Sequence, residues 1–161
     1  MKEIILYRGE VALVDDEDYE YLSKMKWHSS KGYAISTQRD MTSGKQIKIK
    51  MHRLIMNPSK GLLVDHINGN RLDNRRENLR IVTSHQNAFN LSKVSRETTS
   101  QFKGVHFDKA TGKWKGSIRF DGKLIHLGYF SDEKLCAIEY NHHAIKYFGE
   151  FAKLNDVDMN P

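Results

Sequence analysis

The chain has 161 residues, of which 39% are hydrophobic and 29% charged, so we expect a folded protein of one ordinary domain or two small ones. No stretch approaches the ~20 consecutive apolar residues of a membrane helix, the start MKEIILYRGE lacks the apolar core of a secretory leader, and the single Cys136 excludes an internal disulfide or a multi-cysteine zinc site. We therefore expect a cytoplasmic protein with no membrane partner, and its net charge of +6 suggests a polyanion instead.

The residue pattern of residues 1–50 is typical of a β-rich segment. The runs IILY and EVALV predict short strands, and the acidic run DDEDYEYL predicts a turn into a short helix. The runs KGYAIS and KQIKIKMH alternate in hydrophobicity on either side of TSGK, which predicts a hairpin. We expect this segment to pack on the one that follows.

Residues 51–92 form the second segment. It begins with the short apolar run HRLIM, which Asn57-Pro58 stops, and continues as a strand, a long polar loop, a strand and a helix. Thr83 and Gln86 match a capping box, which places Asn87 in the first turn of that helix. Residues 93–100 have little to bury and are predicted to be a linker.

Residues 101–155 form the third segment. The runs FKGVHF, KWKGSIRF and LIHLGYF predict three strands, the last two joined by the hairpin dipeptide DG. A helix is predicted from Ser131, as its N-cap, to Gly149. Alternation places Ile125, Leu127 and Tyr129 on the apolar face of the sheet. The whole chain is thus predicted to be an α+β protein.

The positive charge is concentrated in two central blocks. Residues 45–95 carry +7 and residues 98–127 carry +4, whereas residues 1–44 carry −2 and residues 128–161 carry −3. Such asymmetry fits either two surfaces that face a polyanion or a solvated basic surface without a partner.

The polar loop of the second segment carries the residues best suited to catalysis. Asp65 and His66 end the apolar run LLV, so a strand would deliver an acid and an imidazole to the mouth of the loop, near Asn87 of the following helix. An acid and an amide oxygen suit a hard divalent ion such as magnesium, and a neutral imidazole can take a proton from water. Asp-His pairs also serve as simple turn residues. Spacing alone does not decide between a catalytic site and an ordinary turn.

The run MHRLIM followed by VDHINGNRLDNRRENLRIVTSHQN resembles the HNH nuclease family, in particular the phage and intron-encoded homing endonucleases. The resemblance implies a ββα-metal fold, in which Asp65 and Asn87 are the metal ligands, His66 is the general base and Asn78 orients that histidine. It also implies one ion per active site, and the asparagine at the last position favours Mg²⁺ or Mn²⁺ over zinc.

Other polar side chains around this loop have two possible roles. His52 either points toward the phosphate or packs beneath the loop. Arg75 and Arg76 are candidate phosphate contacts, and a solvated surface role is the alternative.

Residues 102–155 resemble an AP2 domain through KGV, the tryptophan strand, HLGYF, the alanine-bearing helix and the closing LN. The resemblance implies a three-stranded antiparallel sheet packed on one helix, whose exposed face binds double-stranded DNA in the major groove. The candidate DNA-binding residues on that face are Lys103, His106, Lys115, Ser117, Arg119, Lys123 and His126.

Together these features predict a homing-type endonuclease, monomeric or homodimeric, whose metal-dependent nuclease module is targeted to DNA by the AP2-like module. The main alternative is a DNA-binding transcriptional regulator with a vestigial nuclease, and a third is an RNA-binding accessory protein.

Overall fold

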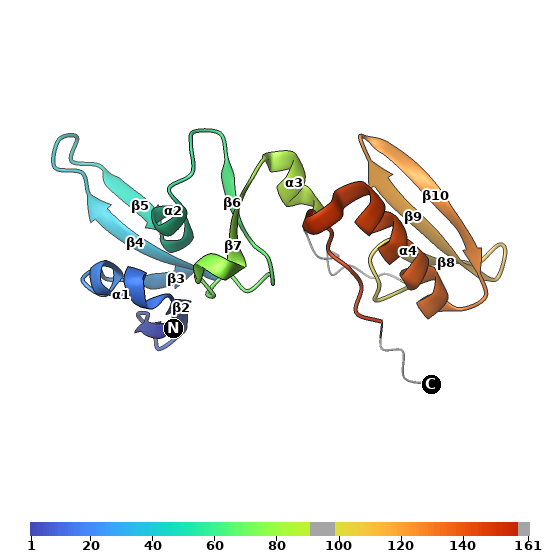
Figure 1. Cartoon of the computed structure of the whole chain (residues 1–161), viewed down its shortest axis with the longest axis horizontal. Coiled ribbons are helices and arrows are strands. Elements are labelled where there is room, and N and C mark those ends of the chain that lie inside the picture. Colours follow the sequence, from blue (N-terminus) through green and yellow to red (C-terminus); the bar gives the residue numbers. More distant parts are fainter. Residues whose placement is uncertain (91–98, 158–161) are drawn as a thin grey trace. The chain divides into compact units, whose positions relative to one another are not determined.

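The computed structural model describes residues 1–90 and 99–157 (Figure 1). The chain divides into two compact units, residues 1–87 and 88–161. It is a mixed α/β structure with several small antiparallel sheets, as the α+β prediction requires. Most of the predicted linker, residues 93–98, lies outside the described residues. No helix in the described part of the chain is long and apolar enough to cross a membrane.

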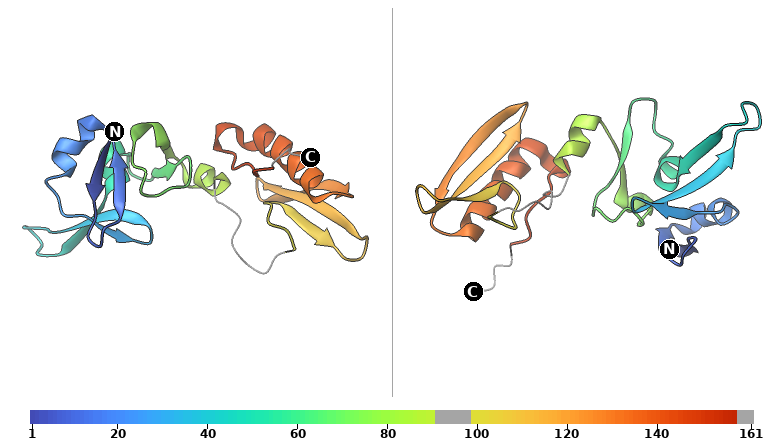
Figure 2. Two further views of the ribbon diagram at one scale, coloured as in Figure 1. Left: turned by 90° about the horizontal axis from the view of Figure 1, so that it is seen from below. Right: turned by 180° about the vertical axis from the view of Figure 1, so that it is seen from behind.

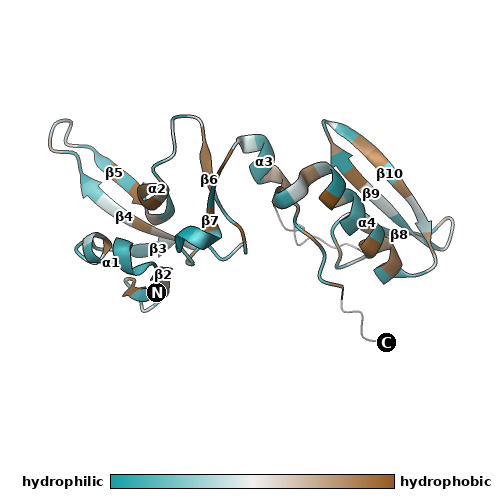
Figure 3. Ribbon diagram, in the orientation of Figure 1, coloured by the Kyte–Doolittle hydropathy of each residue, from teal (hydrophilic) through white to brown (hydrophobic). Residues whose placement is uncertain are grey.

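The first unit opens with a strand pair and a helix, both predicted. Strand β1 (Lys2–Ile5) pairs antiparallel with β2 (Val11–Val14), and helix α1 (Asp16–Leu22) follows. The helix has three acidic residues in its first turn, where negative side chains face the positive end of the helix dipole. Figure 3 shows α1 as mainly hydrophilic, and its buried residues are Asp18 and Leu22.

The predicted hairpin is present and has a third strand. Strands β3 (His28–Ser30), β4 (Tyr33–Arg39) and β5 (Gln46–Lys50) form an antiparallel sheet in that order. Helix α2 (Met51–Met56) follows β5 directly, and its C-cap Asn57 adopts a left-handed conformation with φ 40°. Asparagine tolerates this conformation better than most residues, and Pro58 then prevents the helix from continuing.

The predicted strand, loop, strand and helix follow in that order. Strand β6 (Leu63–His66) pairs antiparallel with β7 (Leu79–Val82), a 3-10 helix (Arg76–Asn78) ends the loop between them, and α3 (Ser84–Phe89) follows β7. The capping box is confirmed: the Gln86 side chain accepts from the Thr83 N–H at 2.9 Å, and Thr83 Oγ1 accepts from the Gln86 N–H at 3.2 Å.

One hydrophobic core joins residues 1–50 to the strand pair. Its buried members come from β1, β2, α1, β4, α2 and β7 and from the loops next to them, and include Leu6, Val14, Leu22, Met51 and Leu79. Figure 3 shows α2 as mainly hydrophobic, which fits its place in this core. The strand pair that carries the loop between β6 and β7 is thus packed on this hydrophobic core.

The second unit is a sheet packed on one helix (Figures 1 and 2). Strands β8 (Val105–Asp108), β9 (Lys113–Phe120) and β10 (Lys123–Phe130) are antiparallel in the order β10-β9-β8, and α4 (Glu133–Phe148) lies against them before a short 3-10 helix (Gly149–Phe151). The N-cap of α4 is Asp132, whose side chain accepts from the Leu135 N–H, so the prediction of Ser131 was wrong by one residue. Gly149 follows the helix as predicted.

The helix buries one narrow face. Cys136, Ala137, Tyr140, Ala144 and Phe148 are buried against Trp114, Ile118 and Phe120 of the sheet. Leu135 and Ile145 are also apolar, but they are 54% and 53% exposed. The small residues in the buried set allow the helix to approach the sheet closely.

Gly104 provides a sharp test of this close packing. It has φ +76°, and a Cβ there would lie 2.1 Å from Cδ2 of Tyr140 and 2.6 Å from the Ser117 carbonyl oxygen. We expect Gly104→Ala to destabilise the second unit by about 3 kcal/mol or more, because backbone strain and overpacking add. Gly112→Ala is the matched control, since it has φ +67° and nothing within 4 Å. Urea unfolding measures both variants, and equal losses would contradict the packing explanation.

Candidate active site

The strand pair β6–β7 presents the two residues that the sequence singled out. The register places Asp65 opposite Arg80 and His66 opposite Leu79, at the end of β6. His66 is 4% exposed, and the Asp65 side chain is 11% exposed. The acid and the imidazole therefore sit on a hydrogen-bonded strand and not on a mobile loop tip.

Asn78 closes the loop that begins at His66. Its Oδ1 accepts from the Asn68 N–H at 2.9 Å, and its Nδ2 donates to the Asp73 carbonyl at 2.8 Å. Both bonds go to loop backbone and not to the imidazole. The Asn78 side chain therefore fixes the backbone of the loop that follows His66.

The environment of His66 favours the neutral imidazole. Burial lowers the pKa of His66 below its ordinary value of 6.5, although the polar Asn74 side chain and the charges of Asp65 and Asp73 act in the opposite direction. A neutral imidazole is the form that accepts a proton. The site therefore holds its candidate base ready at neutral pH.

Two further rings pack around this histidine. The His52 ring is 5.0 Å from that of His66 at 79°, and the Tyr33 ring is 6.0 Å from it. His52 is 3% exposed, so of its two possible roles the structure favours packing beneath the loop. Tyr33 was not singled out from the sequence, because it lies 33 residues before His66 on another sheet.

His52 makes the stability of the first unit depend on pH. Burial, with help from His66, Lys50 and Arg53, lowers the pKa of His52 from 6.5 to about 3. The unfolded chain then binds a proton between these values that the folded unit does not, so stability falls as pH drops from 6.5 toward 3, by roughly 5 kcal/mol at most. We expect His52→Gln to flatten most of this slope in urea unfolding of the first unit. The exposed His85→Gln should leave it intact; an unchanged slope in His52→Gln would contradict the assignment.

Asp65 already has a cationic partner. Arg80 donates through Nε and Nη2 to Oδ2 of Asp65, at 3.0 and 2.9 Å, and the Arg80 side chain is only 12% exposed. Cross-strand pairing explains the contact, since the two residues are opposite in the ladder. An ion at Asp65 would have to share this carboxylate with Arg80.

Asn87 lies on the helix that follows β7. Its backbone N–H donates to the Thr83 carbonyl in the first turn of α3, and its side chain is half-buried. The donor set of Asp65 and Asn87, one carboxylate and one amide oxygen, suits Mg²⁺ or Mn²⁺. Within residues 1–90 and 99–157, no group of three or more His, Cys, Asp or Glu side chains gathers as a metal site.

Arg75 and Arg76 are both engaged by carboxylates. Arg75 pairs with Asp73 at 2.7 Å and with Glu77, and Arg76 pairs with Asp18 at 2.8 Å and with Glu17. These pairs raise the pKa of each guanidinium and tie the loop to itself and to α1. Their charge is largely compensated inside the first unit, which makes them poor candidates for phosphate contacts.

The exposed face of the second unit carries most of the predicted DNA-binding residues. His106, Arg119, Lys123 and His126 are exposed, and Lys115 and Ser117 are half-buried. A bulge between His126 and Gly128 shifts the register of β10, so Tyr129 lies opposite Lys115. Tyr129 is 44% exposed, its ring is 4.9 Å from that of His126, and Lys115 Nζ lies 5.9 Å from its centroid. The prediction that Tyr129 joins the apolar face was therefore wrong.

Lys103 differs from the other predicted DNA-binding residues. It lies before β8, and its Nζ donates to the Phe89 carbonyl at 2.8 Å. Burial, with the charge of Lys153, lowers the pKa of Lys103 to about 8. This ammonium group is tied to the backbone of Phe89, which ends α3 and lies within residues 88–161, and it is not presented on the strands.

Comparison with known proteins places the first unit in a family. The HNH endonuclease family profile matches residues 51–89, the segment from α2 through α3. An uncharacterized HNH endonuclease of Acanthamoeba polyphaga mimivirus is 33% identical over 160 residues, which cover 94% of this chain and 78% of that protein. The chain belongs to the HNH endonuclease family.

Two other proteins match shorter stretches of this HNH family member. Protein 3.8 of Escherichia phage T7 is 36% identical over 64 residues, 40% of this chain and 52% of that protein. APETALA2-like protein 2 of Oryza sativa is 38% identical over 60 residues, 37% of this chain and 14% of that protein. The AP2 similarity is thus partial. No solved structure matches the chain.

Proposed function

We propose that this HNH family member is a metal-dependent DNA endonuclease of the homing type, in which β6, β7 and α3 form the ββα-metal unit. The observation that carries the proposal is a buried histidine, His66, whose burial favours the neutral state and which lies beside Asp65 at the end of β6. Family membership supports a nuclease. We add the metal, the homing type and the targeting by the second unit as further parts of the proposal.

The proposed chemistry assigns one task to each side chain. Neutral His66 takes the proton of an attacking water, while Asn78 keeps the loop that follows the imidazole in place. Asp65 and Asn87 hold one Mg²⁺ or Mn²⁺ ion, which when bound stabilises charge on the scissile phosphate and on the departing 3′ oxygen. The products are a 5′-phosphate and a 3′-hydroxyl.

The second unit is proposed to be an AP2-like reader of double-stranded DNA. Its exposed sheet face offers Lys115, Arg119 and His126, which can contact phosphates or guanine edges. Tethering this sheet to the nuclease raises the effective concentration of the active site at a bound position. One active site per chain makes a nick the expected product of a monomer, and a symmetric double cut would need a homodimer.

The proposed reading face gives a direct prediction about binding. We expect Lys115→Gln with Arg119→Gln to weaken binding of duplex DNA about tenfold, because two cations are removed from one face. Lys134→Gln with Lys146→Gln on α4 is the matched control, since it removes the same charge from the helix. Titration of labelled duplex by fluorescence anisotropy measures both. If the two pairs of substitutions weaken DNA binding equally, the sheet is not the DNA-binding face.

The rival function is a transcriptional regulator with a vestigial nuclease, and one experiment separates the two. The protein is first bound to labelled duplex DNA in chelator, and Mg²⁺ or Mn²⁺ is then added in excess. An endonuclease binds the DNA and then cleaves it, which produces a shorter labelled strand. A regulator stays bound to intact DNA. Intact DNA with both ions would overturn the nuclease assignment, and preference for structured RNA over duplex would overturn the DNA assignment.

A further inference from the structure

The basic side chains nearest the candidate active site differ in whether they have an acidic partner. The arginines of the catalytic loop region, Arg75, Arg76 and Arg80, all pair with carboxylates. By contrast, Lys48, Lys50, Arg53 and Arg71 have no carboxylate within ion-pair distance in the part of the chain that the structure describes. Their charge is therefore available to an anion from outside.

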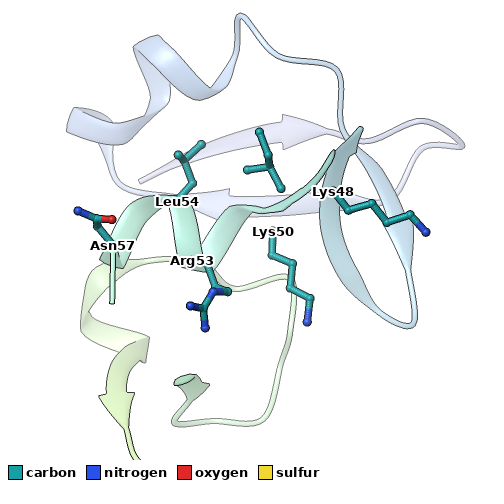
Figure 4. Close-up of a pocket in the computed structure, with 6 residues that line it drawn as sticks. Lys48, Lys50, Arg53, Leu54 and Asn57 are labelled. Carbon is teal, nitrogen blue, oxygen red and sulfur yellow. The ribbon is translucent and has the colours of Figure 1, made fainter. Parts of the chain in front are cut away.

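Three of these four cations line one pocket. It lies where β5 runs into α2, has a volume of about 340 Å³, and is lined by Lys48, Ile49, Lys50, Arg53, Leu54 and Asn57. Lys48 and Lys50 are two residues apart on a strand and so share a face. Figure 4 shows Lys50 and Arg53 extending to the same side of the β5–α2 junction. No acidic side chain lines this pocket, so it offers only positive and neutral groups.

Arg53 is held in place at the pocket wall. Its Nη1 donates to the Leu62 carbonyl at 3.0 Å, just before β6 begins. Its charge is thus fixed relative to the strand that carries Asp65 and His66. A cation that is positioned before binding loses less side-chain entropy when an anion arrives.

Tyr33 connects the pocket to the candidate base. Lys50 Nζ lies 4.9 Å and Arg71 Cζ 4.7 Å from the centroid of the Tyr33 ring. Arg71 also donates to the Lys31 carbonyl at 3.0 Å, which joins the catalytic loop to the turn before β4. The Tyr33 ring is also 6.0 Å from the ring of His66. Lys50, which lines the pocket, and Arg71 therefore lie around a ring that is close to His66.

We propose that Lys48, Lys50, Arg53 and Arg71 form a phosphate track that holds the backbone of the DNA strand on the nuclease unit, beside His66. This inference rests on the proposed function and deepens it. A spaced row of cations along an open pocket fits successive phosphates of a strand better than one small anion. The track makes the nuclease unit a second, sequence-independent DNA contact besides the sheet of the second unit.

The test compares two pairs of lysine variants in the full chain. Lys48→Gln with Lys50→Gln removes two track cations, and Lys2→Gln with Lys26→Gln removes two exposed cations elsewhere in the first unit. Arg53 is left intact because it also holds the Leu62 carbonyl. The dissociation constant for random-sequence duplex DNA is measured in chelator across a range of salt concentrations, so that cleavage plays no part.

Each phosphate contact adds about 0.9 to the slope of log affinity against log salt. We expect the track pair to lower that slope by about 2, so that the affinity lost between about 50 and 200 mM salt shrinks roughly tenfold, whatever the DNA sequence. The control pair should retain the wild-type slope. Arg71→Gln alone should lower the slope by about 1.

The possible outcomes separate the track from the function on which it rests. If the wild type binds and cleaves DNA but the track and control pairs have the same slope, the track is wrong and the nuclease stands. If the wild type does not bind duplex DNA, both fail. Thermal melting of each variant confirms that the exposed substitutions leave the fold intact.

Discussion

Replacing His66 with alanine is expected to slow DNA cleavage by about 10²–10⁴-fold at neutral pH, the size of a lost general base. The imidazole is the only candidate base that the proposal places at the end of β6, and its burial favours the neutral form. Binding of duplex DNA in chelator should remain within about twofold of wild type, because the proposed DNA contacts lie on other side chains. Single-turnover cleavage of a labelled duplex measures the rate.

The pH profile and a second histidine provide the controls. The wild-type rate should fall tenfold per pH unit below the pKa of His66, which burial places below 6.5, and the residual rate of His66→Ala should lack this limb. His52→Gln should keep the limb, since His52 packs against the base without taking the proton. A wild-type profile that follows the same course as that of His66→Ala would show that His66 is not the base.

Replacing Asp65 with asparagine is expected to slow cleavage by roughly 10²–10³-fold, the size of a lost electrostatic contact in a transition state. It should also weaken Mn²⁺ binding about tenfold or more, because the only charged ligand is lost. Calorimetric titration with Mn²⁺ measures binding apart from activity.

The Asp65–Arg80 pair makes a stability control necessary. Removing the carboxylate leaves a mostly buried guanidinium with a weaker partner, which can cost about 3 kcal/mol. Asp18→Asn is the matched control, because Asp18 is 2% exposed and pairs with Arg76 in the same unit. Asp18→Asn should lose stability, yet keep Mn²⁺ affinity and cleavage below its melting temperature. Equal losses of ion binding in both variants would place the metal elsewhere.

Local chemistry in the sequence was enough to predict most of the elements. The capping box at Thr83 and Gln86, the stop at Asn57-Pro58 and the hairpin dipeptide before Lys123 each act within four residues, and all are in the structure. Errors arose where one residue decides the outcome. The bulge after His126 moves Tyr129 to the other face, and alternation cannot foresee a bulge.

The site was predicted less completely than the fold, because its charged side chains pair with residues that are far away in the sequence. Arg75 and Arg76 were natural candidates for phosphate contacts, yet Arg76 pairs with an aspartate 58 residues earlier in the chain. Tyr33 and Lys50 approach the catalytic loop only because β4, β5 and α2 share a core with β7. Sequence spacing carries no information on such pairings.

The most direct test of the central claim is a plasmid assay. Supercoiled DNA is incubated with wild type and with His66→Ala, in Mg²⁺ or Mn²⁺ and in chelator, and the products are then treated with DNA ligase. The wild type with metal should relax the plasmid, and ligase should close the nicks because hydrolysis leaves a 3′-hydroxyl and a 5′-phosphate. A plasmid that stays supercoiled with both ions, or that His66→Ala relaxes as fast as wild type, would contradict the account.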